Sequence, residues 1–284
     1  MFRTPVWLFQ FFSDEVQDSN ISLEKEDDDG NDDEWLEVGP RGTKSCVTRR
    51  VEKRGSENCA KSPLAEMFQG QMRSCVQHSN GDPTATLQPF LTFQLDIQSD
   101  KIGNVADAIS NNFAVETIDG YMCSKTNQEV EASRSMSLEE LPPILVLHLK
   151  RFIYDGSSNG CQKLLKNIDF PVDLEISKDI LSPNSKNKYP VKQRQYKLFA
   201  VVYHNGTEAT KGHYVTDIYH TGLSTWLRCD DSILKTQTES MVLAHSANSV
   251  PYILFYRRGD TMVGNMLNDK SGNKNSPTSN NAKS

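Results

Sequence analysis

Two short strand-forming runs separated by a polar loop are the strongest constraint on how this chain folds. Residues Leu198 to Tyr203 form a continuous apolar run, which is typical of a buried strand. Asn205-Gly206 follows and is a strong turn sequence. Gly212-His213-Tyr214 then opens a second run that alternates through Tyr219. The pattern predicts an antiparallel hairpin with His213 at the mouth of its second strand.

A return strand is predicted directly after this hairpin. Trp226 to Cys229 form a short strand pattern that Asp230-Asp231-Ser232 ends, and 17 positions separate His213 from Asp230. That distance allows one strand, a turn and a return strand, so a carboxylate can lie beside the imidazole and orient it. From the residues alone two interpretations stay open: a catalytic base with its carboxylate, or an ordinary half-buried histidine followed by a turn.

Chain length, net charge, cysteine count and the length of apolar runs limit the classes of protein to consider. The chain has 284 residues, which favours one domain of roughly 200 residues with tails. A net charge of −6 does not indicate the basic surface that nucleic-acid-binding proteins usually carry. Six cysteines without regular spacing indicate reduced intracellular thiols, so we expect a location in the cytoplasm or the nucleus. No run approaches 18 apolar residues, and no membrane span is expected.

Both ends of the chain are predicted to be disordered. The first twelve residues are apolar, but Asp14 and Glu15 follow in place of a small-residue cleavage site, so secretion is not expected. Acidic runs at 27–29 and 32–34 cannot bury a core, which extends the predicted disorder over residues 1–34. A binding tail for a basic partner is the alternative for this segment. Residues 259–284 are rich in Asn, Ser, Gly and Lys and form a second predicted disordered tail.

The middle of the chain is predicted to form mainly strands. Residues 91–97 alternate between apolar and polar, which predicts a half-exposed strand with Met72 to Val76 as its partner. Residues 105–113 carry apolar side chains at helical spacing, and Asn104 is placed to cap them. A near-continuous apolar strand is predicted over 144–149, with His148 as a core histidine. Another strand is predicted over 163–170, and a surface loop over 182–190.

Four motifs, in order over residues 141–258, resemble the ubiquitin-specific protease family of deubiquitinating enzymes. They are Leu141 to Phe152, Gly212 to Val215, Trp226 with Asp230-Asp231, and Pro251 to Tyr256. The resemblance covers about residues 35–258 and implies an α+β, papain-like palm and fingers, mostly antiparallel, with the family's helical N-terminal thumb missing. It divides the chain into a fingers-like β subdomain with a short helix, 35–140, and a palm-like β subdomain carrying the His/Asp pair, 141–258.

The same resemblance implies a reaction and roles for three residues. The reaction is deubiquitination, the thiol-dependent hydrolysis of isopeptide and peptide bonds at the C-terminal glycine of ubiquitin. His213 would be the general base, Asp230 the carboxylate that orients it, and Asp231 a neighbouring polar support. The implied partners are ubiquitin and ubiquitinated proteins.

The chain departs from the family pattern in two places. Lys211 stands where the family usually has the first glycine of Gly-Gly-His, which predicts a different shape for the loop before His213. The family's nucleophile box, similar to Gly-Asn-Thr-Cys-Tyr-Met-Asn, is not found. No cysteine present is predicted to replace it: not Cys46, Cys59, Cys75, Cys123, Cys161 or Cys229. The alternative function is therefore a catalytically inactive ubiquitin-binding fragment or scaffold.

Many members of the family also hold zinc at the fingertips with two Cys-x-x-Cys pairs. Here Cys123 lacks its partner, and Cys75 has no cysteine three residues later. His78 raises the number of possible ligands to three, and these are scattered along the chain. We therefore predict neither zinc nor any other cofactor.

Overall fold

The computed structural model describes residues 36–38, 46–50, 62–79, 83–123, 127–155, 160–209 and 211–262. The predicted disordered segment 1–34 lies outside these residues, and so does the predicted disordered tail 259–284 from residue 263 onward. The prediction was wrong for the start of this tail, which forms the 3₁₀ turn η2(Gly259–Thr261). Within the described part no helix is long and apolar enough to cross a membrane.

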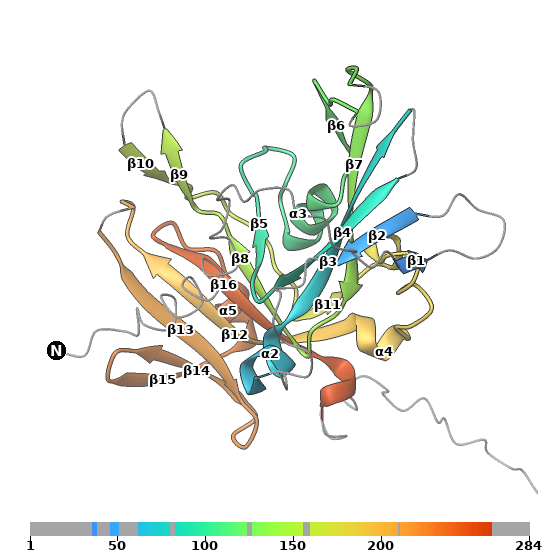
Figure 1. Ribbon diagram of the computed structural model, residues 1–284. Helices are drawn as coiled ribbons and strands as arrows, with labels where there is room; N and C mark the ends of the chain where they lie inside the picture. The colour runs from blue at the N-terminus through green and yellow to red at the C-terminus, as the bar shows by residue number, and fades with distance from the viewer. Residues whose placement is uncertain are drawn as a thin grey trace, which may run out of the picture.

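Two sheets contain most of the strands (Figure 1). The first has six strands, in the order β1(Leu36–Val38), β2(Cys46–Arg50), β4(Thr84–Phe90), β3(Gly70–His78), β7(Ala132–Glu140) and β6(Glu116–Ile118). Its strands pair antiparallel except β2 with β4, which run parallel. Its two long neighbouring strands, β3 and β7, each have nine residues.

The second sheet has eight strands and carries the predicted hairpin. Its order is β15(Ile233–Gln237), β14(Thr225–Asp230), β13(His213–His220), β12(Gln195–Asn205), β16(Ser249–Arg258), β8(Ile144–Leu149) and β5(Phe93–Leu95), with β11(Asp173–Glu175) paired to β12. A separate hairpin is formed by β9(Phe152–Asp155) and β10(Gly160–Lys163). The predicted hairpin and its return strand are thus confirmed as β12, β13 and β14.

Helices are short and few among the described residues. They are α2(Pro63–Phe68), α3(Val105–Asn112), α4(Val191–Arg194) and α5(Glu239–Leu243), with 3₁₀ turns η1(Lys178–Ile180) and η2(Gly259–Thr261). The predicted helix is confirmed as α3: the Asn104 side chain accepts a hydrogen bond from the Asp107 N–H at 2.8 Å, and one face of the helix is buried. The predominance of antiparallel strands confirms the predicted α+β class.

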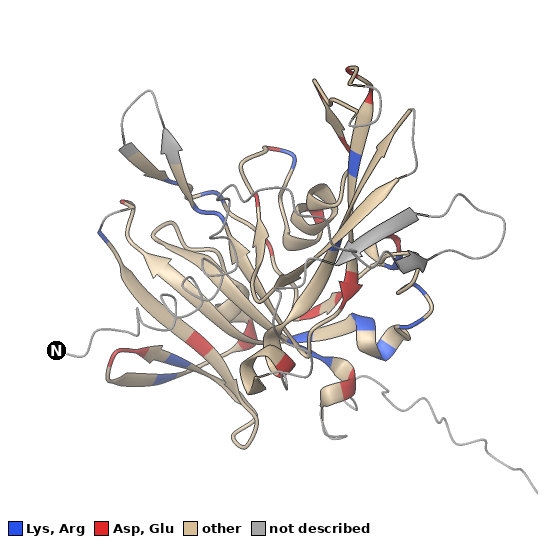
Figure 2. Cartoon of the chain, viewed as in Figure 1, with Lys and Arg blue, Asp and Glu red and all other residues tan. Residues whose placement is uncertain are grey.

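The hydrophobic core combines side chains of β8, β12 and β16 in the second sheet with residues of α3, β4, β7 and the connecting segments. β8 buries Leu145, Val146, Leu147 and Leu149, as its continuous apolar pattern predicted. In the cartoon of Figure 2 the positions of Lys and Arg (blue) and of Asp and Glu (red) are interspersed along the strands and loops.

The predicted partner of the 91–97 strand was wrong. β5 runs parallel to β8 in the second sheet, whereas Met72 to Val76 pair with β4 and β7 in the first. Alternation shows which side chains are buried but carries no information on the neighbouring strand. Phe93 and Leu95 are buried in the core that β8 builds. The subdomain boundary after residue 140 stays a prediction.

Two further expectations for the second half of the chain were wrong. The strand predicted over 163–170 ends at Lys163, because the buried Arg151 guanidinium takes the next carbonyl groups, of Leu164 and Lys166, as acceptors. The surface loop predicted over 182–190 is partly buried: Ser182 and Ser185 are almost inaccessible. Its polar residues therefore satisfy internal hydrogen bonds and are not all solvated.

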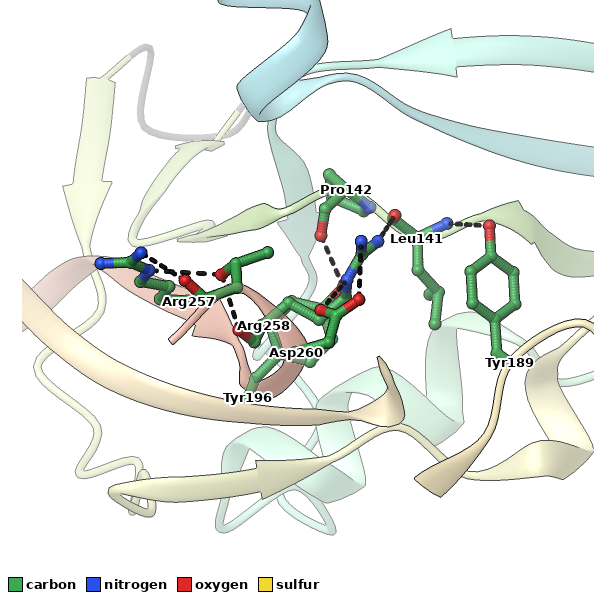
Figure 3. Close-up of polar contacts among 8 residues, drawn as sticks. Leu141, Pro142, Tyr189, Tyr196, Arg257, Arg258 and Asp260 are labelled. Atoms are coloured by element: carbon green, nitrogen blue, oxygen red, sulfur yellow. Dashed lines mark hydrogen bonds and ion pairs between the residues drawn. The ribbon is translucent and has the colours of Figure 1, made fainter. Parts of the chain in front are cut away.

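Polar contacts fix the end of β16 to the turn before β8 (Figure 3). Arg258 donates from Nη1 to the Leu141 carbonyl at 2.5 Å and from Nε to Asp260 at 2.7 Å. The buried Tyr196 hydroxyl donates to the Pro142 carbonyl at 2.7 Å. These bonds tie the last described segment to the middle of the second sheet.

Candidate active site

His213 and Asp230 lie in direct contact at one end of the second sheet. His213 is the first residue of β13 and Asp230 the last of β14. The His213 Nε2 atom is 2.6 Å from Asp230 Oδ1. An ionised carboxylate only accepts hydrogen bonds, so Nε2 carries the proton and the Nδ1 lone pair is left to take another. Both side chains are close to half exposed, 43% and 45%, so a substrate can reach them.

Asp231 lies in the turn between β14 and β15, with a backbone φ of 49°. Among the described residues, His213, Asp230 and Asp231 are the one group of three His, Cys, Asp or Glu whose ligand atoms all lie within 4.8 Å of one another. Neither Cys75 nor Cys123 belongs to a group of this kind in that part of the chain. The expectation that no zinc or other cofactor is bound stays a prediction.

An ion pair with a buried carboxylate and a partly exposed guanidinium joins β13 to β14. Arg228 of β14 donates two hydrogen bonds to Asp217 of β13, at 2.8 and 2.7 Å, and these hydrogen bonds raise the pKa of the guanidinium. Because side chains alternate along a strand, the pair shares a face with His213 and Asp230. Sequence reasoning missed this pair, although two opposite charges at matching positions of a predicted hairpin were a usable signal.

The loop that leads into His213 contains two glycines with different requirements. Gly206 has a φ of 100°, as the Asn205-Gly206 turn signal predicted. Gly212 lies outside this left-handed region, but a Cβ there would come within 2.1 Å of His204 Nε2. Close approach of the buried His204 ring therefore requires this glycine. The different loop shape predicted from Lys211 stays a prediction.

The hydrogen bond of the His213 ring in the described part of the chain goes to Asp230 and not to a cysteine. Cys229 precedes Asp230 on β14 and alternates away from it, and burial raises the pKa of its thiol, which disfavours the thiolate. Cys161 is exposed on β10, while Cys75 and Cys123 lie toward the first sheet. Cys59 lies outside the described residues, as does the side chain of Cys46.

Comparisons with known proteins agree on one family. A family model described as "Ubiquitin carboxyl-terminal hydrolase" matches residues 18–256. The chain is 50% identical to ubiquitin carboxyl-terminal hydrolase 10-A of Xenopus laevis over 240 residues, which cover 84% of this chain and 29% of that protein. It is 51% identical to ubiquitin carboxyl-terminal hydrolase 10 of Gallus gallus over 251 residues, which cover 87% of this chain and 31% of that protein. The chain thus spans about a third of the length of these relatives.

Solved structures show the same fold. The SAGA Ubp8/Sgf11/Sus1/Sgf73 DUB module bound to ubiquitin aldehyde superimposes with a TM-score of 0.61 at 26% identity, covering 73% of this chain and 45% of that one. The palm-and-fingers architecture implied by the four motifs is therefore confirmed. With a family match over most of its residues, the chain belongs to the ubiquitin carboxyl-terminal hydrolase family.

Proposed function

We propose that this chain takes part in deubiquitination, the hydrolysis of isopeptide and peptide bonds at the C-terminal glycine of ubiquitin. The observation that carries the proposal is the 2.6 Å contact between His213 and Asp230 at an accessible strand end. The family match and the ubiquitin aldehyde named for the SAGA module support ubiquitin as the substrate. Ubiquitinated proteins are then the larger substrates.

In the proposed mechanism His213 moves protons and Asp230 keeps its ring in place. His213 Nδ1 takes the proton of a cysteine thiol, and Asp230 stabilises the resulting imidazolium through Nε2–H. The thiolate attacks the terminal glycine carbonyl, and the imidazolium returns its proton to the departing lysine amine. Water, deprotonated by His213, then cleaves the thioester and releases ubiquitin with a free carboxylate.

The nucleophilic thiol is the component that must be located by experiment. Ubiquitin with a C-terminal electrophile forms a covalent adduct with an attacking thiolate, and peptide mass spectrometry identifies the cysteine. An adduct on a cysteine of this chain would overturn the expectation that none of its six cysteines is the nucleophile. We expect His213→Ala to suppress any such adduct, because the thiolate depends on the neighbouring base. An adduct formed equally by the His213→Ala variant would contradict the assignment of His213.

Hydrolysis of a ubiquitin C-terminal fluorogenic amide tests the roles directly. We expect His213→Ala to lower kcat/KM by about 10²-fold or more, and Asp230→Asn to lower it by at least about tenfold. His245→Ala is the matched control, because it removes another exposed histidine whose Nε2 lies 2.6 Å from a carboxylate, that of Asp169. It should change the rate less than about twofold.

Two outcomes would reject the proposal. Equal rates above background for the wild type and His213→Ala would remove His213 from the reaction. Binding of monoubiquitin by a wild-type chain that neither hydrolyses the amide nor forms the adduct would favour the alternative, a catalytically inactive ubiquitin-binding chain.

A further inference from the structure

A lysine joins the β9–β10 hairpin to the loop that leads into His213. Lys163 is the last residue of β10 and pairs with Phe152 of β9. Its Nζ atom donates to the His204 carbonyl at 2.9 Å and also to the Gly206 carbonyl. These carbonyls lie at the end of β12 and in the turn that follows it. One ammonium group therefore holds two adjacent carbonyl groups at the start of the loop.

The same loop is fixed by contacts that continue to His213. The Gly206 N–H donates to the Asn248 carbonyl at 2.8 Å. A Cβ built on Gly206 would lie 3.1 Å from the Lys211 carbonyl oxygen and 3.4 Å from the Gly212 Cα, so the two ends of the loop pack backbone against backbone. Gly212 directly precedes His213. A contiguous path of contacts thus runs from the Lys163 ammonium to the imidazole.

The His204 ring packs against the same path from one side. It is buried, with 3% of its surface exposed, and lies edge-on to Phe152 and tilted against Tyr214. Burial lowers the pKa of His204, and so does the nearby charge of Lys163. The ring therefore stays neutral and acts as a packing element under Gly212, not as a second base.

Lys163 has no carboxylate partner among the described residues, and its recorded acceptors are both carbonyls of this loop. Burial and the nearby Arg151 lower the pKa of the ammonium. A hydrogen bond from a charged donor is shorter and stronger than one from a neutral donor. Because both acceptors are backbone carbonyls, these contacts indicate that the ammonium positions a backbone segment and does not form a surface ion pair.

We propose that Lys163 is a positioning residue that orders the turn at Gly206 and, through Gly212, the imidazole of His213. It touches neither the reacting bond nor the His213 side chain. Its effect on turnover rests on the proposed function, whereas its effect on loop order does not. The hairpin β9–β10 and the base-carrying strand β13 are thereby coupled.

Lys163→Met is the informative variant, because it keeps a long apolar side chain and removes the donor. We expect kcat to fall about tenfold with little change in KM, because the charged hydrogen bonds that hold the start of the loop are lost. Amide hydrogen exchange at Gly206 and at residues 212–214 should become about tenfold faster. Lys163→Arg retains charged N–H donors and should recover part of both effects.

Lys166→Met is the matched control. Lys166 lies on the same segment, and its ammonium also donates to two backbone carbonyls, those of Ile97 and Ser99, away from His213. This variant should keep kcat within about twofold and leave exchange at Gly206 unchanged. If Lys163→Met does not fold, Lys163→Gln gives the same comparison with a neutral donor.

Amide hydrogen exchange tests the positioning role of Lys163 independently of the proposed hydrolysis. Faster exchange at Gly206 and 212–214 in Lys163→Met supports the loop-ordering role even if no variant hydrolyses ubiquitin substrates. Unchanged exchange and unchanged kcat would overturn the proposal. A rise in KM alone, with exchange unaltered, would also overturn it, because Lys163 would then act in ubiquitin binding and not in positioning.

Discussion

Asp217 on β13 accepts two hydrogen bonds from Arg228 on β14, and its carboxylate is completely buried. The guanidinium is one-third exposed and lies over the Tyr203 ring, 5.6 Å from its centre. Its bonds to Asp217 join the two strands whose ends carry His213 and Asp230. This pair therefore joins the two strands on the same face as His213 and Asp230, further along the strands.

We expect Asp217→Asn to lower the free energy of unfolding by about 1–3 kcal/mol, because a buried bidentate pair loses its charge and one good acceptor. The partial exposure of Arg228 keeps the loss below that of a fully buried pair. Urea unfolding followed by tryptophan fluorescence measures it. Arg134→Met is the control: its bond to Glu116 is exposed and should contribute less than about 1 kcal/mol. Equal losses would contradict the role of burial.

The protonation of His148 predicts how stability depends on pH. Burial, with a smaller effect of Lys150, lowers the pKa of His148 from 6.5 to about 4. Between these values the unfolded chain binds the extra proton and the folded chain does not. The stability that neutral His148 contributes is therefore fully present above pH 6.5. As the pH falls from 6.5 toward 4, the free energy of unfolding decreases by about 3 kcal/mol in total.

His148→Gln should remove this contribution. We expect the free energy of unfolding of the variant to fall less than that of the wild type between pH 7 and pH 4.5, by about 2–3 kcal/mol. Comparing the two proteins cancels the titration of the carboxylates they share. Parallel pH profiles would show that the imidazole is protonated in the folded protein as readily as in the unfolded chain.

Local patterns predicted the elements around the site well. The continuous apolar run before Asn205-Gly206 and the alternating run after it placed His213 and Asp230 at neighbouring strand ends, where the structure has them in contact. This succeeded because consecutive strands joined by short connections usually pair, and the two-residue period then fixes which side chains share a face. The catalytic roles of these residues stay a prediction.

Longer-range relations were beyond the reach of those patterns. The pairing of β5 with β8 joins strands about 50 residues apart, and alternation alone does not select a partner. Arg151 ended a predicted strand by taking the carbonyl groups that a ladder would use. In the sequence, nothing distinguishes Lys163 from a solvated surface lysine. Its contact with the His204 carbonyl arises only because the hairpin β9–β10 lies beside β12. Such contacts arise from the packing of elements and not from local propensity.

The buried Arg151 should be one of the most sensitive positions in the fold. It is inaccessible to solvent, donates from Nε to the Pro251 carbonyl at 2.9 Å and from Nη1 to the Leu164 carbonyl at 3.2 Å, and burial lowers its pKa to about 10. We expect Arg151→Met to lower the free energy of unfolding by about 3 kcal/mol, because these buried carbonyls lose their donors.

Arg151→Lys should recover little of that stability, since one ammonium cannot replace a planar group with donors in several directions. Urea unfolding of the three proteins measures the difference. A Lys variant as stable as the wild type would show that charge, and not the geometry of the guanidinium, satisfies these carbonyls.

Gly212→Ala tests the close approach beneath the proposed base. A Cβ at this position would lie 2.1 Å from His204 Nε2 and 2.6 Å from the Asn205 carbonyl oxygen, so either the ring or the backbone must move. The His204 ring has little room, because Phe152 and Tyr214 enclose it. We expect a loss of about 1–3 kcal/mol in the free energy of unfolding and a fall of at least about tenfold in hydrolysis, because displacement of the backbone moves His213.

Gly103→Ala is the matched control, because a Cβ there would meet nothing within 4 Å. It should leave hydrolysis unchanged and alter the free energy of unfolding by no more than about 1 kcal/mol, with an increase expected from the lower entropy of the unfolded chain. Comparing the two glycine variants separates steric contact from the general effect of adding a methyl group. If Gly212→Ala behaves like Gly103→Ala, the His204 ring can yield, and the loop does not depend on this contact to place His213.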